Sequence, residues 1–408
     1  MEYTKLKYIN QYKSKSINPA KTPDTIFEMY SVPIYATGHP EYLRGDEIAS
    51  NKAIVRKNDI LLCKINPRIN RVWVVSDESG KQNIASSEWI VIRNSEYNPE
   101  FLAWYFRTPK FQKFMTSEIT GIGGSLTRAQ PKCVAEYPVP VLNRKKQDEI
   151  VNILDKCKLV IDSRKRELLE LDNIIKARFV ELFGDPRSNP FGFEKKMLKD
   201  TCKVITGNTP SRAIAEYYGD YIEWIKTDNI VSGILNPTQA TESLSEKGMN
   251  VGRTVEKDSI LMACIAGSIA SIGRVCITDR TVAFNQQINA VVPEQYNILF
   301  LYVLLQMSKD YLVEDINMAL KGILSKSKLE EKEFIIPPMD LQEQFSDFVK
   351  QVDKSKVKVQ KALDETQKLF DSLMQQYFGW KGEKLNGDND GVPWWISGCR
   401  ENGNQKRS

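Results

Sequence analysis

Histidine is almost absent from this 408-residue chain, which holds one copy, His39. That scarcity excludes a histidine-rich metal site and makes histidine acid–base catalysis a poor expectation. His39 lies between a glycine and a proline in a turn-like segment, so an ordinary loop residue is favoured over a functional one.

Long apolar runs and paired cysteines are missing as well. With no apolar stretch of 18 residues, no transmembrane helix is expected, and the polar, charged N-terminus does not look like a signal peptide. The seven cysteines include no CxxC pair, which indicates reduced thiols instead of a disulfide framework or a zinc site. We therefore expect a cytoplasmic protein that has no membrane partner and binds no metal.

The charge of the chain is mildly basic and unevenly placed. The net charge is +5, and residues 1–143 carry the excess, with 19 Lys and Arg against 14 Asp and Glu. Residues 144–408 hold 38 of each kind. Such an excess permits nucleic-acid binding without requiring it.

The sequence repeats itself at a distance of about 200 residues. Four short segments recur in the same order, with offsets that drift from 200 through 199 and 198 to 195. The pairs are 57–62 with 257–262, 97–102 with 296–301, 125–128 with 323–326, and 183–184 with 378–379. This period is too long for a solenoid and predicts two copies of a domain-plus-helix unit.

Each copy ends in a long charged helix with a heptad pattern of apolar residues. The helices are expected at 144–184 and 340–380, and Gly184 and Gly379 are typical residues after a helix end. The first seam is Ile150, Leu154, Cys157, Ile161, Leu168, Leu171, Ile175 and Leu182. The second is Phe345, Val349, Val352, Val359, Leu363, Phe370, Leu373 and Tyr377.

The apolar side chains of each seam must be buried, and the simplest partner for each long helix is the other long helix. The predicted fold is therefore α+β, with two similar globular domains at 1–143 and 185–339 joined by an antiparallel two-helix coiled coil, as a pseudo-two-fold repeat. Two alternatives are that each helix packs on its own domain or that it zips a homodimer. Residues 381–408 are expected to form a flexible tail, although 392–396 (VPWWI) are unexpectedly apolar.

Two similar domains on a rigid rod suit a ligand with two spaced sites. Duplex DNA is such a ligand, because sites on one face recur every ~34 Å. Similar but unequal domains would each read a different half of an asymmetric, interrupted site.

The sequence resembles the specificity (S) subunit of type I restriction-modification systems over residues 1 to about 380. The resemblance is carried by residues 177–186 (ARFVELFGDP), 335–344 (IIPPMDLQEQ) and 206–211 (TGNTPS) with 224–228 (WIKTD). Residues 64–75 (KINPRINRVWVV) also look like one class of first target-recognition domain.

The resemblance implies a non-catalytic DNA-reading subunit. Its partners would be double-stranded DNA, two methylation subunits that use S-adenosylmethionine to methylate adenine and, where present, restriction subunits that use ATP and magnesium. Each target-recognition domain would read one half of the site, while the helices set the spacer and dock the methylation subunits. No cofactor would bind to this chain itself.

Missing motifs agree with that expectation. Residues 66–69 (NPRI) lack the second proline and the aromatic of an adenine methyltransferase tetrapeptide, and no GxxxxGK[ST] loop occurs. Residues 121–126 are glycine-rich but lack the lysine, so we expect a loop and no nucleotide site.

The first candidate DNA-binding group lies in residues 64–71, KINPRINR, between two strand-like runs. Its members are Lys64, Asn66, Arg68, Asn70 and Arg71. The arginines can fork onto guanine or phosphate, the asparagines can pair with adenine, and Lys64 suits a phosphate. The alternative is a surface turn whose side chains cap strand ends or pair with carboxylates.

Two further groups follow the repeat and the resemblance. Thr127, Arg128 and Lys132 are matched with Ser325, Lys326 and Lys328 and are expected to hold phosphates, unless they are solvated residues before a strand. The third group follows from the resemblance and consists of Thr209, Ser211, Arg212, Lys226 and Thr227, whereas Asp228 is favoured as a structural cap.

Two other interpretations remain open at this point. Arg164 and Arg178 break the first seam and either pair across the rod with acids such as Asp347, Asp353 or Glu365, face a partner subunit, or stay solvated. A two-headed coiled-coil adaptor for protein partners would explain the helices equally well, but it would not explain the Arg, Lys and Asn loops.

Overall fold

The computed structural model describes residues 2–117, 119–120, 127–314, 316 and 322–379. The glycine-rich residues 121–126 and the tail expected at 381–408 lie outside these ranges.

Contacts divide the chain into two units. Unit 1 holds residues 1–162 with 363–408, and unit 2 holds residues 163–362. Because each boundary falls inside a long helix, each unit consists of a globular part and one half of each long helix. This division differs from a linear series of domains and helices.

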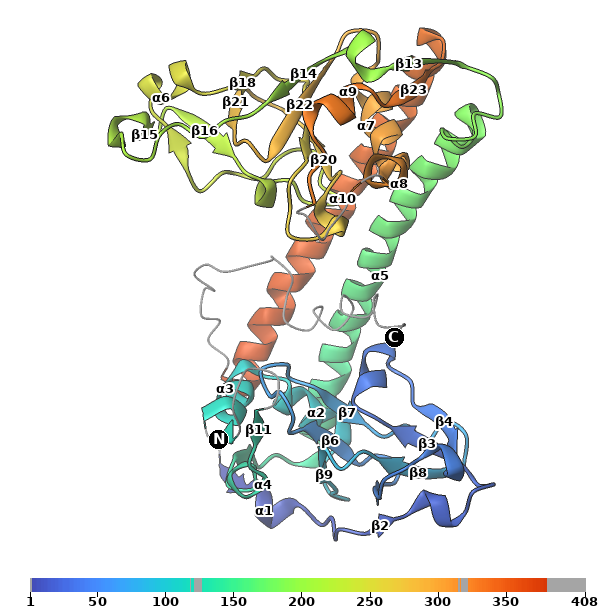
Figure 1. The fold of residues 1–408 in the computed structure, drawn as a ribbon. Helices are drawn as coiled ribbons and strands as arrows, with labels where there is room; N and C mark the ends of the chain where they lie inside the picture. The colour runs from blue at the N-terminus through green and yellow to red at the C-terminus, as the bar shows by residue number, and fades with distance from the viewer. Residues whose placement is uncertain (1, 118, 121–126, 315, 317–321, 380–408) are drawn as a thin grey trace. The chain divides into compact units, whose positions relative to one another are not determined.

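The globular part of unit 1 combines short strands and short helices (Figure 1). Its strands are β1 (Tyr3–Lys5), β2 (Ser16–Ile17), β3 (Ile26–Tyr30), β4 (Glu41–Arg44), β5 (Lys52–Ile54), β6 (Ile60–Cys63), β7 (Val72–Val74), β8 (Gln82–Ala85), β9 (Trp89–Ile92), β10 (Ile119–Thr120), β11 (Arg128–Ala129) and β12 (Pro138–Pro140). Its helices are α1 (Leu6–Ile9), α2 (Pro99–Phe106), α3 (Pro109–Ser117) and α4 (Pro131–Val134). The strands form sheets of order β2-β5-β8-β3-β4 and β7-β6-β9, with pairs β1-β12 and β10-β11.

The globular part of unit 2 follows a similar plan. Its strands are β13 (Glu194–Met197), β14 (Cys202–Thr206), β15 (Tyr218–Gly219), β16 (Ile222–Ile225), β17 (Ser243–Leu244), β18 (Thr254–Val255), β19 (Ile260–Ala263), β20 (Val275–Ile277), β21 (Val282–Phe284), β22 (Ile288–Pro293) and β23 (Glu333–Ile336). Its helices are α6 (Glu246–Val251), α7 (Ile298–Met307), α8 (Lys309–Val313) and α9 (Lys326–Glu330). The sheets have the orders β14-β22-β19-β20 and β15-β17-β16-β21-β18, with the pair β13-β23.

Strand pairing confirms that the two globular parts are copies of one design. In unit 1, β6 lies between β7 and β9, and in unit 2, β19 lies between β20 and β22, all antiparallel. Each unit also has one parallel pair, β3 with β8 and β16 with β21. Asn58 (φ 69°) and Asp258 (φ 65°) precede the two central strands in the left-handed conformation that Asn and Asp tolerate.

A duplicated glutamine fastens the base of each long helix. The side chain of Gln147 accepts from the Asn98 amide at 2.7 Å and donates to the Leu142 carbonyl at 2.8 Å. In unit 2, Gln342 accepts from the Asn297 amide at 2.9 Å and donates to a proline carbonyl at 2.8 Å. Both glutamines are buried, so each joins its helix to the cap of a neighbouring helix.

The long helices are α5 (Arg144–Phe183) and α10 (Met339–Phe378), each of 40 residues. Each ends at a glycine with positive φ, 71° at Gly184 and 65° at Gly379, as glycine permits. A Cβ at Gly184 would also lie 2.2 Å from the Pro190 ring, so no other residue fits that turn without rearrangement.

The last turn of each helix packs onto the globular part of the unit in which it ends. In unit 2, the Phe183 ring of α5 meets Phe300 of α7 at 4.8 Å. In unit 1, the Phe378 ring of α10 meets Phe101 of α2 at 5.6 Å. The repeated Phe-Gly pair is therefore a repeated docking contact, and the first helix ends on the second globular part while the second helix ends on the first.

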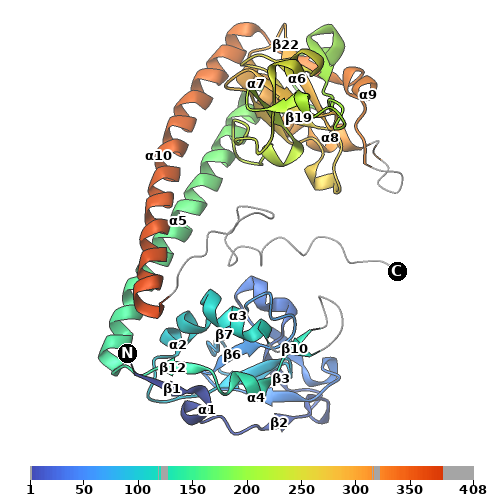
Figure 2. The ribbon, with the colours of Figure 1, turned by 90° about the vertical axis from the view of Figure 1, so that its left-hand side faces the viewer.

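Within unit 2 the helices run antiparallel and side by side (Figure 2). Phe179 of α5 meets Phe345 of α10 at 5.5 Å. Asp172, which precedes Phe179 on α5, pairs at 2.7 Å with Lys356, which follows Phe345 on α10, as expected of antiparallel helices. The second expected seam is buried from Phe345 to Phe370, whereas the first is buried at Ile150, Leu154, Ile161 and Ile175 and half-buried at Cys157, Leu168 and Leu171. At the helix ends, the buried residues are Phe179, Phe183, Met374 and Phe378, whereas Leu182, Leu373 and Tyr377 are only half-buried.

The seam-breaking arginines form ion pairs on their own helix. Arg164 pairs with Glu167 at 2.6 Å, and Arg178 pairs with Glu181 at 2.8 Å. Lys356, one of the breaks in the second seam, does form an ion pair across the helices, with Asp172. Side chains three residues apart are neighbours on one helix face, so such ion pairs form within a helix.

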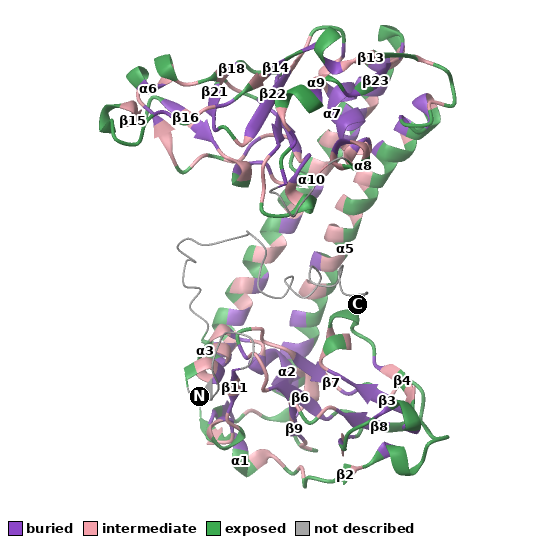
Figure 3. Ribbon diagram, in the orientation of Figure 1, coloured by how far each residue is buried: buried purple, intermediate pink, exposed green. Residues whose placement is uncertain are grey.

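Buried residues concentrate in the central strands and the adjoining helices of each unit (Figure 3). Three of the buried residues are Cys202, Cys264 and Cys276, and burial raises the pKa of each thiol to about 12. Such thiols stay protonated and unreactive at neutral pH. Among the described residues, no helix is long and apolar enough to cross a membrane.

Candidate nucleic-acid interface

The loop of residues 64–71 joins β6 to β7, and its backbone is held by residues 127–129. Asn66 turns the chain with φ 46°, and its N–H donates to the Thr127 carbonyl at 2.8 Å. Ala129 donates to the Lys64 carbonyl at 2.9 Å. The first two candidate DNA-binding groups of unit 1, distant in sequence, therefore lie side by side.

Arg68 is the exposed member of this loop, while the other four candidates are half-buried. The Gln112 side chain donates to the Arg68 carbonyl, which fixes the backbone and leaves the guanidinium outside. Asn70 donates its amide to the Phe106 carbonyl at 2.9 Å, where α2 ends and carbonyls lack helical partners. Arg71 accepts from the Cys63 N–H at 3.0 Å through its carbonyl.

Arg128 is paired with a carboxylate from the turn before β9. Its Nε and Nη2 lie 3.2 and 3.3 Å from the two oxygens of Glu88, a forked arrangement. The Glu88 carbonyl also accepts from the Lys64 N–H at 2.9 Å. Thr127 is buried, with 4% of its surface exposed, so it offers little surface to a phosphate.

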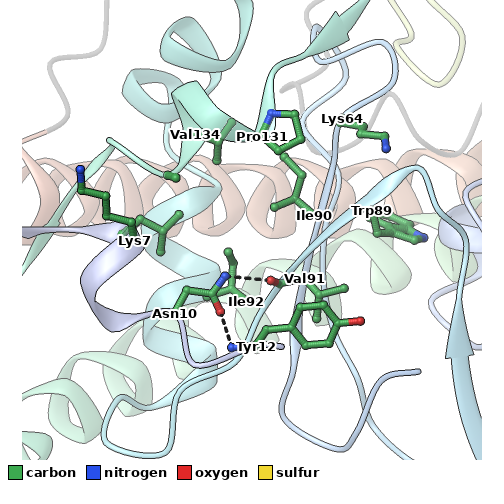
Figure 4. A pocket seen from close by; sticks show the side chains of 12 residues that line it. Lys7, Asn10, Tyr12, Lys64, Trp89, Ile90, Val91, Ile92, Pro131 and Val134 are labelled. Atoms are coloured by element: carbon green, nitrogen blue, oxygen red, sulfur yellow. Dashed lines mark hydrogen bonds between the residues drawn. The ribbon is translucent and has the colours of Figure 1, made fainter. Parts of the chain in front are cut away.

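Beside this region lies a cavity of about 280 Å³, lined by β9, the N-terminal segment and the start of α4 (Figure 4). Asn10 closes one side, because its side chain donates to the Val91 carbonyl at 3.0 Å and accepts from the Tyr12 N–H at 3.0 Å. Lys64 and Trp89 line another part. Lys64 therefore borders a mostly apolar cavity, in contrast to the exposed Arg68.

The structure corrects one step of the sequence matching. Ile65 bridges Arg128 in unit 1, and Ile265 bridges Ile323 in unit 2, so Arg128 corresponds to Ile323 and not to Lys326. The hydrogen bonds Ala129 N to Lys64 O and Leu324 N to Cys264 O give the same offset. The offset between the two copies has therefore already fallen from 200 to 195 residues at this position. The hydroxyl and cation that recur at 127–128 and 325–326 do not lie at equivalent positions in the two units.

The three lysines of that second group lie on short helices and are exposed. Lys132 is on α4, while Lys326 and Lys328 are on α9. Lys326 lies 3.5 Å from Glu330 on the next turn, and the Lys328 N–H donates to Ser325, which caps the helix. Their role in binding phosphates stays a prediction.

In unit 2 the segment 206–211 forms a loop held from several sides. Gly207 passes so close to the neighbouring backbone that a Cβ would lie 2.1 Å from the Asn285 carbonyl oxygen. Asn208 donates to the Val251 carbonyl and accepts from the Arg253 N–H, both at 2.8 Å. The Tyr218 hydroxyl donates to the Pro210 carbonyl at 2.6 Å. These contacts give the loop a defined shape.

Arg212 and Lys226 meet around one carboxylate and two aromatic rings. The Arg212 guanidinium lies 4.5 Å from the Tyr218 ring and 5.2 Å from the Trp224 ring, and the Lys226 ammonium lies 5.2 Å from the Trp224 ring. Glu242 contacts both cations, with its Oε2 2.6 Å from Arg212. We call these five residues the Glu242 cluster.

The remaining candidates of unit 2 border this cluster or the loop. Thr209 is exposed and hydrogen-bonds to Gln286, and Ser211 is also exposed. Thr227 begins a 3-10 turn, and its carbonyl accepts from Arg274 at 3.4 Å. The cap expected of Asp228 is made by its neighbour Asn229, whose side chain accepts from the Lys226 N–H at 2.9 Å.

Sequence reasoning missed the acidic and aromatic members of these sites. Glu88 and Glu242 each pair with a candidate cation, and Tyr218 stacks on one. The two carboxylates lie 40 and 30 residues from their arginines in sequence. No local pattern marks such pairs, because they depend on strands brought together by folding.

Comparison with known proteins points to one family. Residues 190–366 match the model of the type I restriction modification DNA specificity domain. The chain is 34% identical over 149 residues to the HindI specificity subunit of Haemophilus influenzae and 23% identical over 323 residues to the MjaIX specificity subunit of Methanocaldococcus jannaschii. The comparisons support a type I specificity subunit.

The matches differ in extent. The Haemophilus match covers 35% of this chain and 31% of that subunit, whereas the Methanocaldococcus match covers 74% and 71%. The family model covers most of unit 2, so the specificity domain is placed most firmly there.

Solved structures support the same fold. A chain from a study of complex assembly in a type I restriction-modification system aligns with a TM-score of 0.54 at 18% identity, covering 92% of this chain and 97% of that one. The type I S subunit from M. genitalium aligns with a TM-score of 0.56 at 12% identity, covering 92% and 95%. The two-domain, two-helix design is thus shared with specificity subunits.

The described residues contain no group of three or more His, Cys, Asp or Glu side chains arranged to hold a metal ion.

Proposed function

We propose that this chain is the sequence-reading subunit of a type I restriction-modification complex. The observation that carries the proposal is the specificity domain of residues 190–366 in a chain whose other unit repeats its strand pairing. Each unit would read one half of an interrupted site. In unit 1, Arg68 would approach the DNA. In unit 2, the loop of residues 206–211 would approach it together with Arg212.

The long helices would fix the distance between the half-sites and dock two methylation subunits. Their ends are anchored by buried phenylalanines in both units, so they are suited to act as a fixed spacer. S-adenosylmethionine, and ATP with magnesium where restriction subunits are present, would bind to those partners in the cytoplasm. This chain would contribute binding energy and no catalysis.

Direct binding and partner capture test the proposal together. The full chain, co-expressed with its methylation subunit, should shift a duplex that carries its motif at lower concentration than a scrambled duplex. A ratio of about 10³ or more is typical of specific DNA binding. Equal affinity for both duplexes, together with capture of partners that lack methyltransferase motifs, would favour the adaptor interpretation instead.

A further inference from the structure

Glu242 holds both cations of its cluster at once. Its two carboxylate oxygens contact different side chains, Oε1 the Lys226 ammonium and Oε2 the Arg212 guanidinium. The cations are also stacked against Tyr218 and Trp224, so they are held in place from two directions. About a third of the Glu242 side chain stays exposed, so the carboxylate faces solvent as well as its partners.

The carboxylate keeps its charge under physiological conditions. The hydrogen bond from Lys226, followed by that from Arg212, holds the pKa of Glu242 below its usual value. A DNA phosphate that approaches Arg212 or Lys226 must therefore compete with a negative charge already in contact with both. An ionised carboxylate is also a hydrogen-bond acceptor that can receive the amino group of a cytosine.

Unit 1 contains a comparable arrangement at its own candidate interface. Arg128 is forked onto Glu88, whose side chain is 27% exposed, beside the loop that carries Arg68. The two acids precede different strands, Glu88 before β9 and Glu242 before β17, so they are not copies of each other. An acid held against a candidate DNA-binding arginine thus occurs in both units.

We propose that Glu242 is a specificity-determining residue of unit 2, which accepts a base amino group in the matched site and repels the backbone of unmatched DNA. This inference rests on the proposed function. On matched DNA, Arg212 and Lys226 turn from Glu242 to the phosphates, and the hydrogen bond from the base amino group compensates the Glu242 carboxylate for the lost ion pairs. On unmatched DNA the charge is left uncompensated, and binding is weakened.

The test compares Glu242→Gln with Glu314→Gln in the full chain assembled with its methylation subunits. Glu314 is a matched control, because it also contacts two cations, Arg187 at 2.8 Å and Lys332 at 3.1 Å, and its side chain is 30% exposed. Affinities for the duplex carrying the mapped motif and for a scrambled duplex are measured by fluorescence anisotropy over a range of salt concentrations. Melting temperatures confirm that both variants fold.

Glu242→Gln is expected to raise the affinity for scrambled duplex about three- to tenfold and to steepen the salt dependence by about one unit, since one or two more cations become available to phosphates. Affinity for the matched duplex should stay equal or fall, so discrimination decreases. Glu242→Asp, which keeps the charge, should retain the weak binding to scrambled duplex.

Four results would overturn the inference. One is an equal rise in affinity for both duplexes in Glu242→Gln. Another is a Glu314→Gln variant whose affinities for the two duplexes change in the same way as those of Glu242→Gln. The third is a wild-type complex that fails to distinguish matched from scrambled duplex, which would refute the proposed function as well. Normal wild-type discrimination with an unaltered Glu242→Gln variant would refute the inference alone.

Discussion

At the scale of single residues, Arg68 offers the most direct test of unit 1. Because it is exposed while its backbone is fixed, Arg68→Ala should remove a contact without disturbing the loop. If Arg68 reads a base, site-specific binding should weaken by about 1–3 kcal/mol and the preference at one position should relax. Anisotropy with matched and single-mismatch duplexes measures both effects.

Arg56→Ala is the control for that variant, since Arg56 is also exposed but precedes β6, whereas Arg68 follows it. Unchanged affinity and unchanged preference in Arg68→Ala would remove Arg68 from the interface.

Glu28 gives unit 1 a pH-dependent source of stability. Its fully buried carboxylate accepts from the Ser79 and Glu78 amides at 2.8 and 2.9 Å and from the Tyr30 hydroxyl at 2.7 Å. Burial alone would raise the pKa of Glu28, but these hydrogen bonds, with that from the Ser79 hydroxyl, outweigh it and lower the pKa below 4.5. The ionised form is therefore stabilised by folding.

The sign of the effect follows from the lowered pKa. The stabilisation is complete above about pH 4.5 and is lost as the pH falls through the lower folded-state pKa. Glu28→Gln should cost about 1–3 kcal/mol in the free energy of unfolding at pH 7, and this cost should shrink in acid. Denaturant titrations from pH 7 to pH 3 measure it, with exposed Glu96→Gln as control. A cost that is constant across this range would contradict the account.

The sequence identified many of the polar residues at the interface but not their partners. The segment 64–71 was predicted as a loop between strands, and it is one. The roles of Asn70 as a cap for α2 and of Glu88 as the partner of Arg128 depend on contacts between segments 36 to 40 residues apart. Those contacts leave no local pattern in the sequence.

At the scale of elements, the docking of each helix end should dominate the stability of the unit it enters. Phe378→Ala would leave a cavity beside Phe101 and should cost about 3–5 kcal/mol, whereas the adjacent Tyr377→Ala, at a half-buried position, should cost about 1 kcal/mol. Chemical denaturation of the full chain measures both. Equal costs would show that Phe378 does not anchor the helix.

Heptad periodicity was sufficient to predict the two long helices because the spacing of apolar residues is a local property. It was less accurate at their last turns, where a helix faces a globular part as well: Phe183 of α5 meets both Phe300 of α7 and Phe345 of α10. There the large aromatic side chains are buried, and the heptad positions Leu182, Leu373 and Tyr377 are not. The matching of 125–128 with 323–326 failed for a related reason, since insertions between short strands shift an offset without changing the fold.

At the scale of the whole molecule, the helices are predicted to set the spacer of the recognition site. A seven-residue insertion in both helices, after Asp162 and after Ala362, keeps the heptad pattern and lengthens each by about 10 Å. At ~3.4 Å per base pair, the spacer should grow by about three base pairs while both half-sites stay the same. A spacer of unchanged length would refute this role. An insertion in α10 alone serves as control and should impair assembly.

The measurement that tests the central claim most directly is a map of methylated adenines in genomic DNA from cells with and without this chain. The account predicts that deletion abolishes methylation at one interrupted, asymmetric motif and that the wild-type gene restores it. Complementation with Arg68→Ala should then alter only one half of the motif. An identical methylation map with and without the chain, while its methylation partner is expressed, would contradict the account.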